Sequence, residues 1–187
     1  MSAKSISKIN AASRQLDLAI RLHFQDADVI GVHTLGGAAH GILRDLLAQS
    51  AGSSGVSVPH SNAHRSQHKY VVKMVRDAIG FLKHADRDPK RMLRFNSRWT
   101  DFLLYDAIEM HIRLTREVTH SNAIFLIWVT SKYPTVILFD EILGEGIAEL
   151  RRLFPRLGRA GTQKRPFLTV LDAVPNPVLQ RTRGARR

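Results

Sequence analysis

The sequence contains no cysteine. This absence excludes a disulfide framework and a thiolate zinc site, so a transition-metal site would need histidine and carboxylate ligands. The chain also lacks a long apolar run: the longest, "AIFLIWV" at 123–129, is far shorter than the roughly 20 residues that span a bilayer. The first ten residues lack the apolar core of a signal peptide. The sequence therefore predicts a cytoplasmic protein without a membrane partner.

Acids are scarce at the C-terminal end. Residues 151–187 hold ten Arg and Lys against one acid, whereas residues 1–150 hold 18 bases and 15 acids. Such a basic arm is typical of proteins that bind nucleic acid or another polyanion, and the alternative is a poorly ordered end without a function. If the arm functions, the residues expected to contact nucleic acid are Arg156, Arg159, Lys164, Arg165, Arg181, Arg183, Arg186 and Arg187.

Helical periodicity recurs along the rest of the chain. In the segment 10–24 the apolar residues Leu16, Ala19, Ile20 and Phe24 share one face, which predicts an amphipathic helix. Further helices are expected at 29–49, 66–83, 100–118 and 135–154. The apolar run at 123–129 fits a buried helix or a buried strand, and we interpret it as a helix because the body carries no other strand signal.

The segment 29–49 is apolar on more than one side, as in a helix at the middle of a bundle. It contains four glycines, including Gly36 and Gly37, which either let neighbouring helices approach closely or break the helix locally. Without repeats at solenoid periods, the sequence predicts an all-α bundle of five or six helices over 1–154, followed by a basic, partly disordered tail over 155–187. An apolar helix face is expected to support a homodimer.

Two sets of histidines have regular spacing. His60, His64 and His68 recur every four residues, so on a helix they would line one face and could hold a metal ion. Proline and serine among them favour turns, and no nearby carboxylate would orient the imidazoles. His33 and His40, seven apart, are expected as polar positions at the edge of the core. The sequence thus predicts no metal site and no cofactor.

The stretch "GFLKHADRDP" at 80–89 has two interpretations. In the structural one, Lys83 and His84 end the third helix, where the helix dipole favours cations. Asp86 and Asp88 then satisfy turn amides, and Pro89 stops the helix. This interpretation explains every residue without catalysis.

In the functional interpretation His84 is a general acid or base, Arg76 or Arg87 stabilises a phosphate, and Asp86 sets the imidazole tautomer. Such a set would cleave RNA without a metal ion, with the 2′-hydroxyl as nucleophile. Arg76 and His84 are eight residues apart, so on one helix their side chains point in directions about 80° apart. This divergence argues against a catalytic pair formed by Arg76 and His84. Whether the protein is an enzyme is left open at this point.

The segment "ASRQLDLAIRLHFQDADVIGVHTLGGAAHGILRDLL" at 12–47, with "GFLKHADRDP" and "DFLLYDAIEMHIRLT", resembles an uncharacterised family of bacterial all-helical proteins. The resemblance covers roughly residues 6–153, and "FLKHADRD" is its most distinctive block. It brings no established activity, substrate or partner.

More distantly, the first two helices are similar to those of the higher-eukaryote and prokaryote nucleotide-binding (HEPN) families. That resemblance implies a dimeric helical domain with metal-independent ribonuclease activity, whose catalytic pattern is an Arg, four to six residues, and a His. Here seven residues separate Arg76 from His84, so the pattern is not matched.

These observations lead to a first functional hypothesis and an alternative. The first is a binding or interaction module with a basic tail that contacts nucleic acid. The alternative is a HEPN-like ribonuclease that uses His84 with Arg76 or Arg87.

Overall fold

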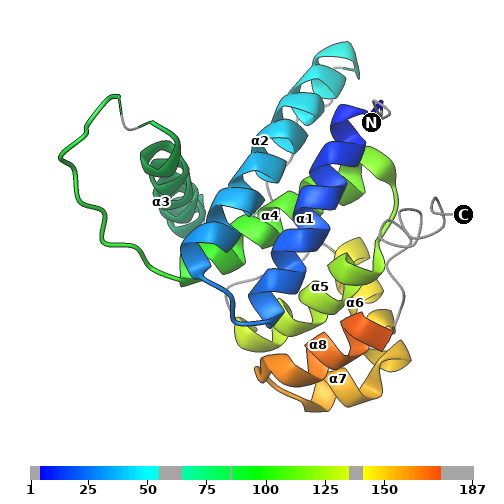
Figure 1. The fold of residues 1–187 in the computed structure, drawn as a ribbon. Coiled ribbons are helices and arrows are strands. Elements are labelled where there is room, and N and C mark those ends of the chain that lie inside the picture. Colours follow the sequence, from blue (N-terminus) through cyan, green and yellow to red (C-terminus); the bar gives the residue numbers. More distant parts are fainter. Residues whose placement is uncertain (1–4, 55–64, 85, 135–140, 174–187) are drawn as a thin grey trace, which may run out of the picture.

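The computed structural model describes residues 5–54, 65–84, 86–134 and 141–173. Within these ranges the chain forms eight helices and no strand, so the predicted all-α class is confirmed, with more helices than the five or six expected (Figure 1). The helices are α1 (Lys8–Phe24), α2 (Val29–Ser54), α3 (Arg65–Lys83), α4 (Arg98–Thr115), α5 (His120–Lys132), α6 (Glu141–Leu153), α7 (Pro155–Arg159) and α8 (Lys164–Ala173).

Helix α1 carries the apolar face that the sequence predicts. Leu16, Ala19, Ile20 and Phe24 are all buried, and they pack against α2, α4 and α5 in one core. In Figure 1, α1 and α2 run side by side, α3 stands on the far side of α2, and α6 to α8 gather at the base of the molecule. The core therefore lies between α1, α2, α4 and α5, with the last helices closing its lower end.

Helix α2 runs without a break through its glycines. A Cβ atom at Gly36 would lie 2.9 Å from Leu104 Cδ2, and one at Gly37 would lie 3.0 Å from Ile79 Cγ1. The glycines therefore let α4 and α3 approach the backbone of α2. Of the two alternatives that the sequence leaves open, close approach is confirmed.

The apolar run at 123–129 is helical, as predicted. Thr119 caps α5, because its Oγ1 accepts a hydrogen bond from the Asn122 backbone N–H at 3.2 Å. Residues 122–130 are buried without interruption. A helix that is apolar on all sides has to be covered on all sides, and α5 accordingly occupies the centre of the lower half of the bundle (Figure 1).

The chain after Phe154 differs from the tail that the sequence predicts. Pro155 occupies the first turn of α7, where its missing N–H costs nothing. Leu157, Phe167 and Leu171 are almost fully buried in the same core as α1 and α5. The expected boundary after residue 154 thus falls inside a packed unit that reaches at least residue 173, and the later residues lie outside the described ranges.

None of the helices in the described ranges combines the length and apolarity needed to cross a membrane.

Candidate functional site

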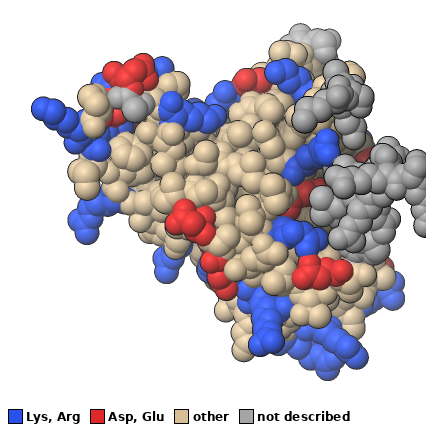
Figure 2. Space-filling model, in the orientation of Figure 1, with Lys and Arg blue, Asp and Glu red and all other residues tan. Residues whose placement is uncertain are grey.

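The candidate site is the basic end, by which we mean residues 151–173. It holds six basic residues and one acid. Figure 2 shows Lys and Arg gathered at the bottom of the molecule, where Figure 1 places α7 and α8. The basic residues are Arg151, Arg152, Arg156, Arg159, Lys164 and Arg165, and the acid is Asp172.

Half of these cations are engaged with the protein itself. Arg151 donates a hydrogen bond to Thr130 Oγ1 at 3.0 Å, and Arg152 pairs with Glu149 at 2.6 Å. That pairing lowers the pKa of Glu149 and raises the pKa of Arg152. Lys164 is also engaged, with partners on α1. Arg151 and Lys164 thus link neighbouring helices, Arg152 pairs within α6, and all three are less available to a ligand.

The other three cations are free for a partner. Arg156, Arg159 and Arg165 are exposed, and none makes an ion pair within the part of the chain that the structure describes. Arg156 and Arg159 are three residues apart in α7 and so lie on one face. The acid of the region, Asp172, pairs with Arg21 of α1. The basic end thus presents three unneutralised guanidinium groups.

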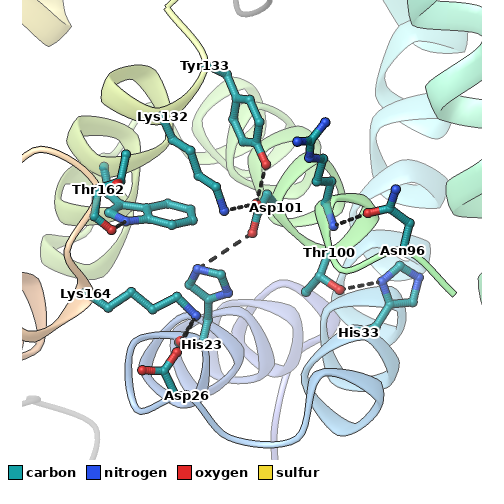
Figure 3. Close-up of polar contacts among 12 residues, drawn as sticks. His23, Asp26, His33, Asn96, Thr100, Asp101, Lys132, Tyr133, Thr162 and Lys164 are labelled. Carbon is teal, nitrogen blue, oxygen red and sulfur yellow. Dashed lines mark hydrogen bonds and ion pairs between the residues drawn. The ribbon is translucent and has the colours of Figure 1, made fainter.

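The basic end is fixed to the body by both apolar and polar contacts. Phe167 of α8 stacks on Phe24 of α1, with ring centroids 5.5 Å apart. Trp128 Nε1 donates to the Thr162 carbonyl at 3.1 Å. Lys164 Nζ donates to the His23 carbonyl at 2.8 Å and to Asp26 Oδ1 at 2.9 Å (Figure 3). The three free arginines therefore sit on an anchored surface.

A buried carboxylate lies under this anchorage. Asp101 of α4 is only 2% exposed. Its Oδ2 accepts hydrogen bonds from Lys132 Nζ at 2.8 Å and from the Tyr133 hydroxyl at 2.7 Å. On the other side, His23 Nε2 lies 3.7 Å from Asp101 Oδ1 (Figure 3). We call Asp101, Lys132, Tyr133 and His23 the Asp101 centre.

The charges of the Asp101 centre are balanced within it. Burial, together with the positive charges of Lys164 and Lys132, lowers the pKa of His23 to about 3, so His23 is neutral at pH 7. Burial and the hydrogen bond to Asp101 raise the pKa of Tyr133. Lys132, which also lies 4.5 Å from the Trp128 ring centroid, neutralises the carboxylate. Lys132 and Tyr133 both donate to Oδ2, so the centre joins α4 to the end of α5, with His23 of α1 beside the other carboxylate oxygen.

No local sequence pattern indicates the Asp101 centre. Its members come from α1, α4 and the end of α5, and only the packing of the helices brings them together. A local signal existed in Lys132 and Tyr133, polar residues directly after a long apolar run, but nothing in it indicates Asp101 as their partner.

His33 and His40 lie deeper than the core edge that the sequence predicts. They are 0% and 5% exposed, between α2 and α4. His33 Nδ1 lies 3.1 Å from Thr100 Oγ1, and His40 Nε2 lies 2.7 Å from Asp106 Oδ2. Burial lowers the pKa of His33 to about 4. Polar partners on α4 let these imidazoles occupy interior positions that the pattern of α2 alone does not assign to them.

Ser13, His111 and Asn122 form a polar chain between α1, α4 and α5. His111 Nε2 lies 2.8 Å from Ser13 Oγ, and His111 Nδ1 lies 3.3 Å from Asn122 Nδ2. The orientation of the Asn122 amide determines which ring nitrogen of His111 carries the proton. With Asn122 Nδ2 facing Nδ1, the imidazole donates from Nε2 to Ser13, which is the reverse of the direction that activates a serine nucleophile.

The residues of the "KHADRD" block lie at an exposed helix end. His84 directly follows α3, and its backbone N–H donates to the Gly80 carbonyl at 3.1 Å. Its Nδ1 is 3.9 Å from Asp86 Oδ1, with both side chains substantially exposed. Arg76 is exposed two turns earlier on α3, and Arg87 is exposed in the following turn. The structure brings His84 and Asp86 together, in an arrangement that resembles a helix end more than an enclosed active site.

Some predicted residues cannot be placed. Arg181, Arg183, Arg186 and Arg187 lie outside the described ranges. So do His60 and His64, while His68 is described only as part of the α3 backbone. In the ranges that are described, no group of three or more His, Asp or Glu side chains is arranged to hold a metal ion.

Comparison with known proteins gives no match: no protein-family model, no curated protein and no solved structure matches the chain. The resemblance to HEPN families and to bacterial helical proteins therefore stays a prediction.

Proposed function

We propose that the protein binds nucleic acid through the basic end, together with the arginines that follow it in the sequence. The observation that carries this proposal is the set of three exposed guanidinium groups, Arg156, Arg159 and Arg165, without an ion pair among the described residues. The acid of this region, Asp172, is already paired with Arg21. Arginines that have no carboxylate partner attract a polyanion, because no acidic side chain competes with the phosphates for their guanidinium groups.

Arginine suits this role better than lysine. Its planar guanidinium donates two parallel hydrogen bonds to a phosphate and keeps its charge at every physiological pH. The helices that carry the three residues are held by buried Leu157, Phe167 and Leu171, so little backbone freedom is lost on binding. Four more arginines after residue 173 would add to the same charge.

The test measures the affinity for labelled DNA and RNA as a function of salt, for the whole chain and for the triple variant Arg156→Gln, Arg159→Gln, Arg165→Gln. Each lost phosphate contact lowers the slope of log K against log salt by about 0.9 on a duplex and about 0.7 on a single strand. We expect the slope to fall by roughly two to three and the affinity near about 0.1 M salt to fall at least tenfold.

A matched control removes the same number of charges elsewhere. Lys8, Lys73 and Lys90 are exposed and lie on α1, on α3 and in the loop before α4. Their replacement by Gln should leave the slope within about one unit of the wild type. If both triple variants lose affinity equally, binding depends on net charge alone and the assignment to the basic end is wrong. Truncation after Phe154 is unsuitable, because it removes three core side chains.

RNA cleavage by His84 is the second candidate. The observation that favours it is the exposed imidazole, with Asp86 3.9 Å from Nδ1 and Arg76 and Arg87 exposed nearby in the sequence. The test incubates a mixed RNA pool with wild type and His84→Ala in EDTA. Cleavage by the wild type alone, at unchanged thermal stability, supports catalysis. Absence of cleavage by the wild type eliminates this candidate.

Self-association and a cytoplasmic location are also parts of the proposal. The large apolar side chains exposed in the described residues are Ile6, Leu18, Met92, Val118 and Leu153, and they come from separate parts of the chain. Leu18, on the outer side of α1, is the position from which a helix-to-helix dimer would be tested, with Leu18→Glu and sedimentation velocity as the readout. A wild type that sediments as a monomer at every concentration would rule out the dimer.

A further inference from the structure

The basic end has a second property, which concerns how it would contact a nucleic acid. The basic end contains two aromatic residues. Phe154 is half-buried against the core and meets the His120 ring, with centroids 6.1 Å apart. Phe167 is 0% exposed and stacks on Phe24 inside the core. Trp128 of α5, which donates its N–H to the Thr162 carbonyl, is 1% exposed. The basic end therefore offers no fully exposed aromatic ring to a base.

The absence of fully exposed aromatic rings distinguishes between two modes of nucleic-acid binding, base stacking and phosphate contact. Proteins that hold single strands stack successive bases on exposed aromatic rings, each worth about 1–3 kcal/mol. A surface that offers guanidinium groups alone has to take its affinity from phosphates and from the counterions that they release. Duplexes present more phosphate charge per unit length and release more counterions per contact, about 0.9 against about 0.7 for single strands.

The fixed position of the basic end also favours a duplex over a single strand. Lys164 bonds to the His23 carbonyl and to Asp26, and Arg21 pairs with Asp172, so α8 is tied to α1 and the turn after it near both of its ends. Guanidinium groups held on fixed helices match the regular phosphates of a duplex, whereas a flexible single strand must be ordered before it can make the same contacts.

We infer that the basic end binds double-stranded nucleic acid through phosphates, without base specificity. This inference rests on the proposed function, since it names the class of nucleic acid that the same surface takes. The partner is defined by its chemistry: two strands of phosphates at regular spacing, with the bases enclosed. DNA and RNA duplexes share that chemistry, and separate arms of the experiment distinguish them.

The experiment measures fluorescence anisotropy with the whole chain and four labelled probes: a short duplex, each of its strands alone, and a duplex of scrambled sequence. DNA and RNA versions are run in parallel. We expect the duplex to bind at least tenfold more tightly than either strand. The scrambled duplex should bind within about twofold of the original, with a salt slope close to 0.9 times the number of phosphates contacted.

Two failures are distinguishable. If a single strand binds as tightly as the duplex, or the scrambled duplex binds tenfold more weakly than the original, this inference is wrong while the proposed function stands. If no probe binds, or if the Arg156, Arg159 and Arg165 triple variant binds like the wild type, the proposed site is wrong and the inference falls with it. A preference of one duplex type over the other identifies the partner as DNA or RNA.

Discussion

Phe167 of α8 stacks on Phe24 of α1, with ring centroids 5.5 Å apart and ring planes only 5° from parallel. Both side chains are almost fully buried, and Phe24 also meets Trp128 edge-on at 5.7 Å. Offset aromatic pairs contribute about 0.5–1.5 kcal/mol beyond the area they bury. This contact joins a helix near the start of the chain to the last helix described.

Phe167→Ala should therefore destabilise the whole fold. Deletion of a buried phenyl ring costs about 3–5 kcal/mol, since it removes apolar contacts and leaves a cavity. The measurement is urea unfolding followed by circular dichroism. Met92→Ala is the control, because Met92 is 90% exposed and its change should stay within about 0.5 kcal/mol. A cost below about 1 kcal/mol for Phe167→Ala would show that α8 is not part of the core.

Lys132→Met and Asp101→Asn should differ in cost, although both break the same ion pair. Asp101 is 3% exposed at its side chain and Lys132 is 32% exposed. Loss of Lys132 leaves a buried charge unpaired, which costs about 3–5 kcal/mol, whereas loss of the Asp101 charge leaves an ammonium that can reach water. We expect Lys132→Met to be the more destabilising of the two variants, as measured by urea unfolding at neutral pH. Equal losses of stability for the two variants would contradict this account.

Acidification should weaken the fold through its buried histidines. The folded-state pKa values of His23 and His33 are about 3 and about 4, against 6.5 for the free side chain. The unfolded chain binds protons that the folded chain excludes, so stability falls as pH drops below about 6.5 and continues to fall towards about 4. Asp17 acts in the opposite direction at lower pH, because burial raises its pKa.

The slope of the free energy of unfolding against pH shows which histidines cause the loss of stability. Each histidine that stays neutral in the folded state contributes up to about 1.4 kcal/mol per pH unit. His33→Gln should therefore reduce the slope between about pH 6 and pH 5 by roughly that amount, while its stability at neutral pH reports the lost contact with Thr100. The measurement is the free energy of unfolding in urea across this range. An unchanged slope would mean that His33 titrates in the folded protein.

Gly36 and Gly41 lie in the same helix, α2, but differ in how closely other side chains approach them. A Cβ at Gly36 would meet Leu104 Cδ2 at 2.9 Å, whereas a Cβ at Gly41 would meet nothing within 4 Å. Gly41→Ala should stabilise the protein by about 0.5–1 kcal/mol, because alanine favours the helix. Gly36→Ala should be destabilising in spite of that gain, since overpacking costs about 1–3 kcal/mol. Thermal unfolding of the two variants compares them, and stabilisation by both would disprove close packing at Gly36.

Local patterns account for most of the fold that the sequence predicted. The spacing of Leu16, Ile20 and Phe24 marks the buried face of α1, and the apolar run at 123–129 is helical because nothing in the body offers it a strand partner. Phe167 and Leu171 carried a similar signal at four-residue spacing. That signal is weak because prolines and basic residues surround it, and because α8 is short and depends on its packing against α1 and α5.

The residues of the Asp101 centre could not be predicted in the same way. The sequence predicts a helix from residue 100, but α4 begins at Arg98, so Thr100 and Asp101 both lie in its first turn and are buried in the core. Their partners are determined by how α1 and α5 cross α4, which is a property of three-dimensional packing. The sequence predicts the excess of basic residues in the basic end, but not the contacts that fix this segment to α1 and α5.

The stacking of Phe24 on Phe167 also bears on how the chain folds during synthesis. Phe24 leaves the ribosome early, and at about 5–20 residues per second its partner follows on the order of ten seconds later. During that interval α1 can pair with α2, but one side of the ring stays uncovered. A nascent chain in this state keeps apolar surface exposed until α8 arrives, which makes the last helix the step that completes the core.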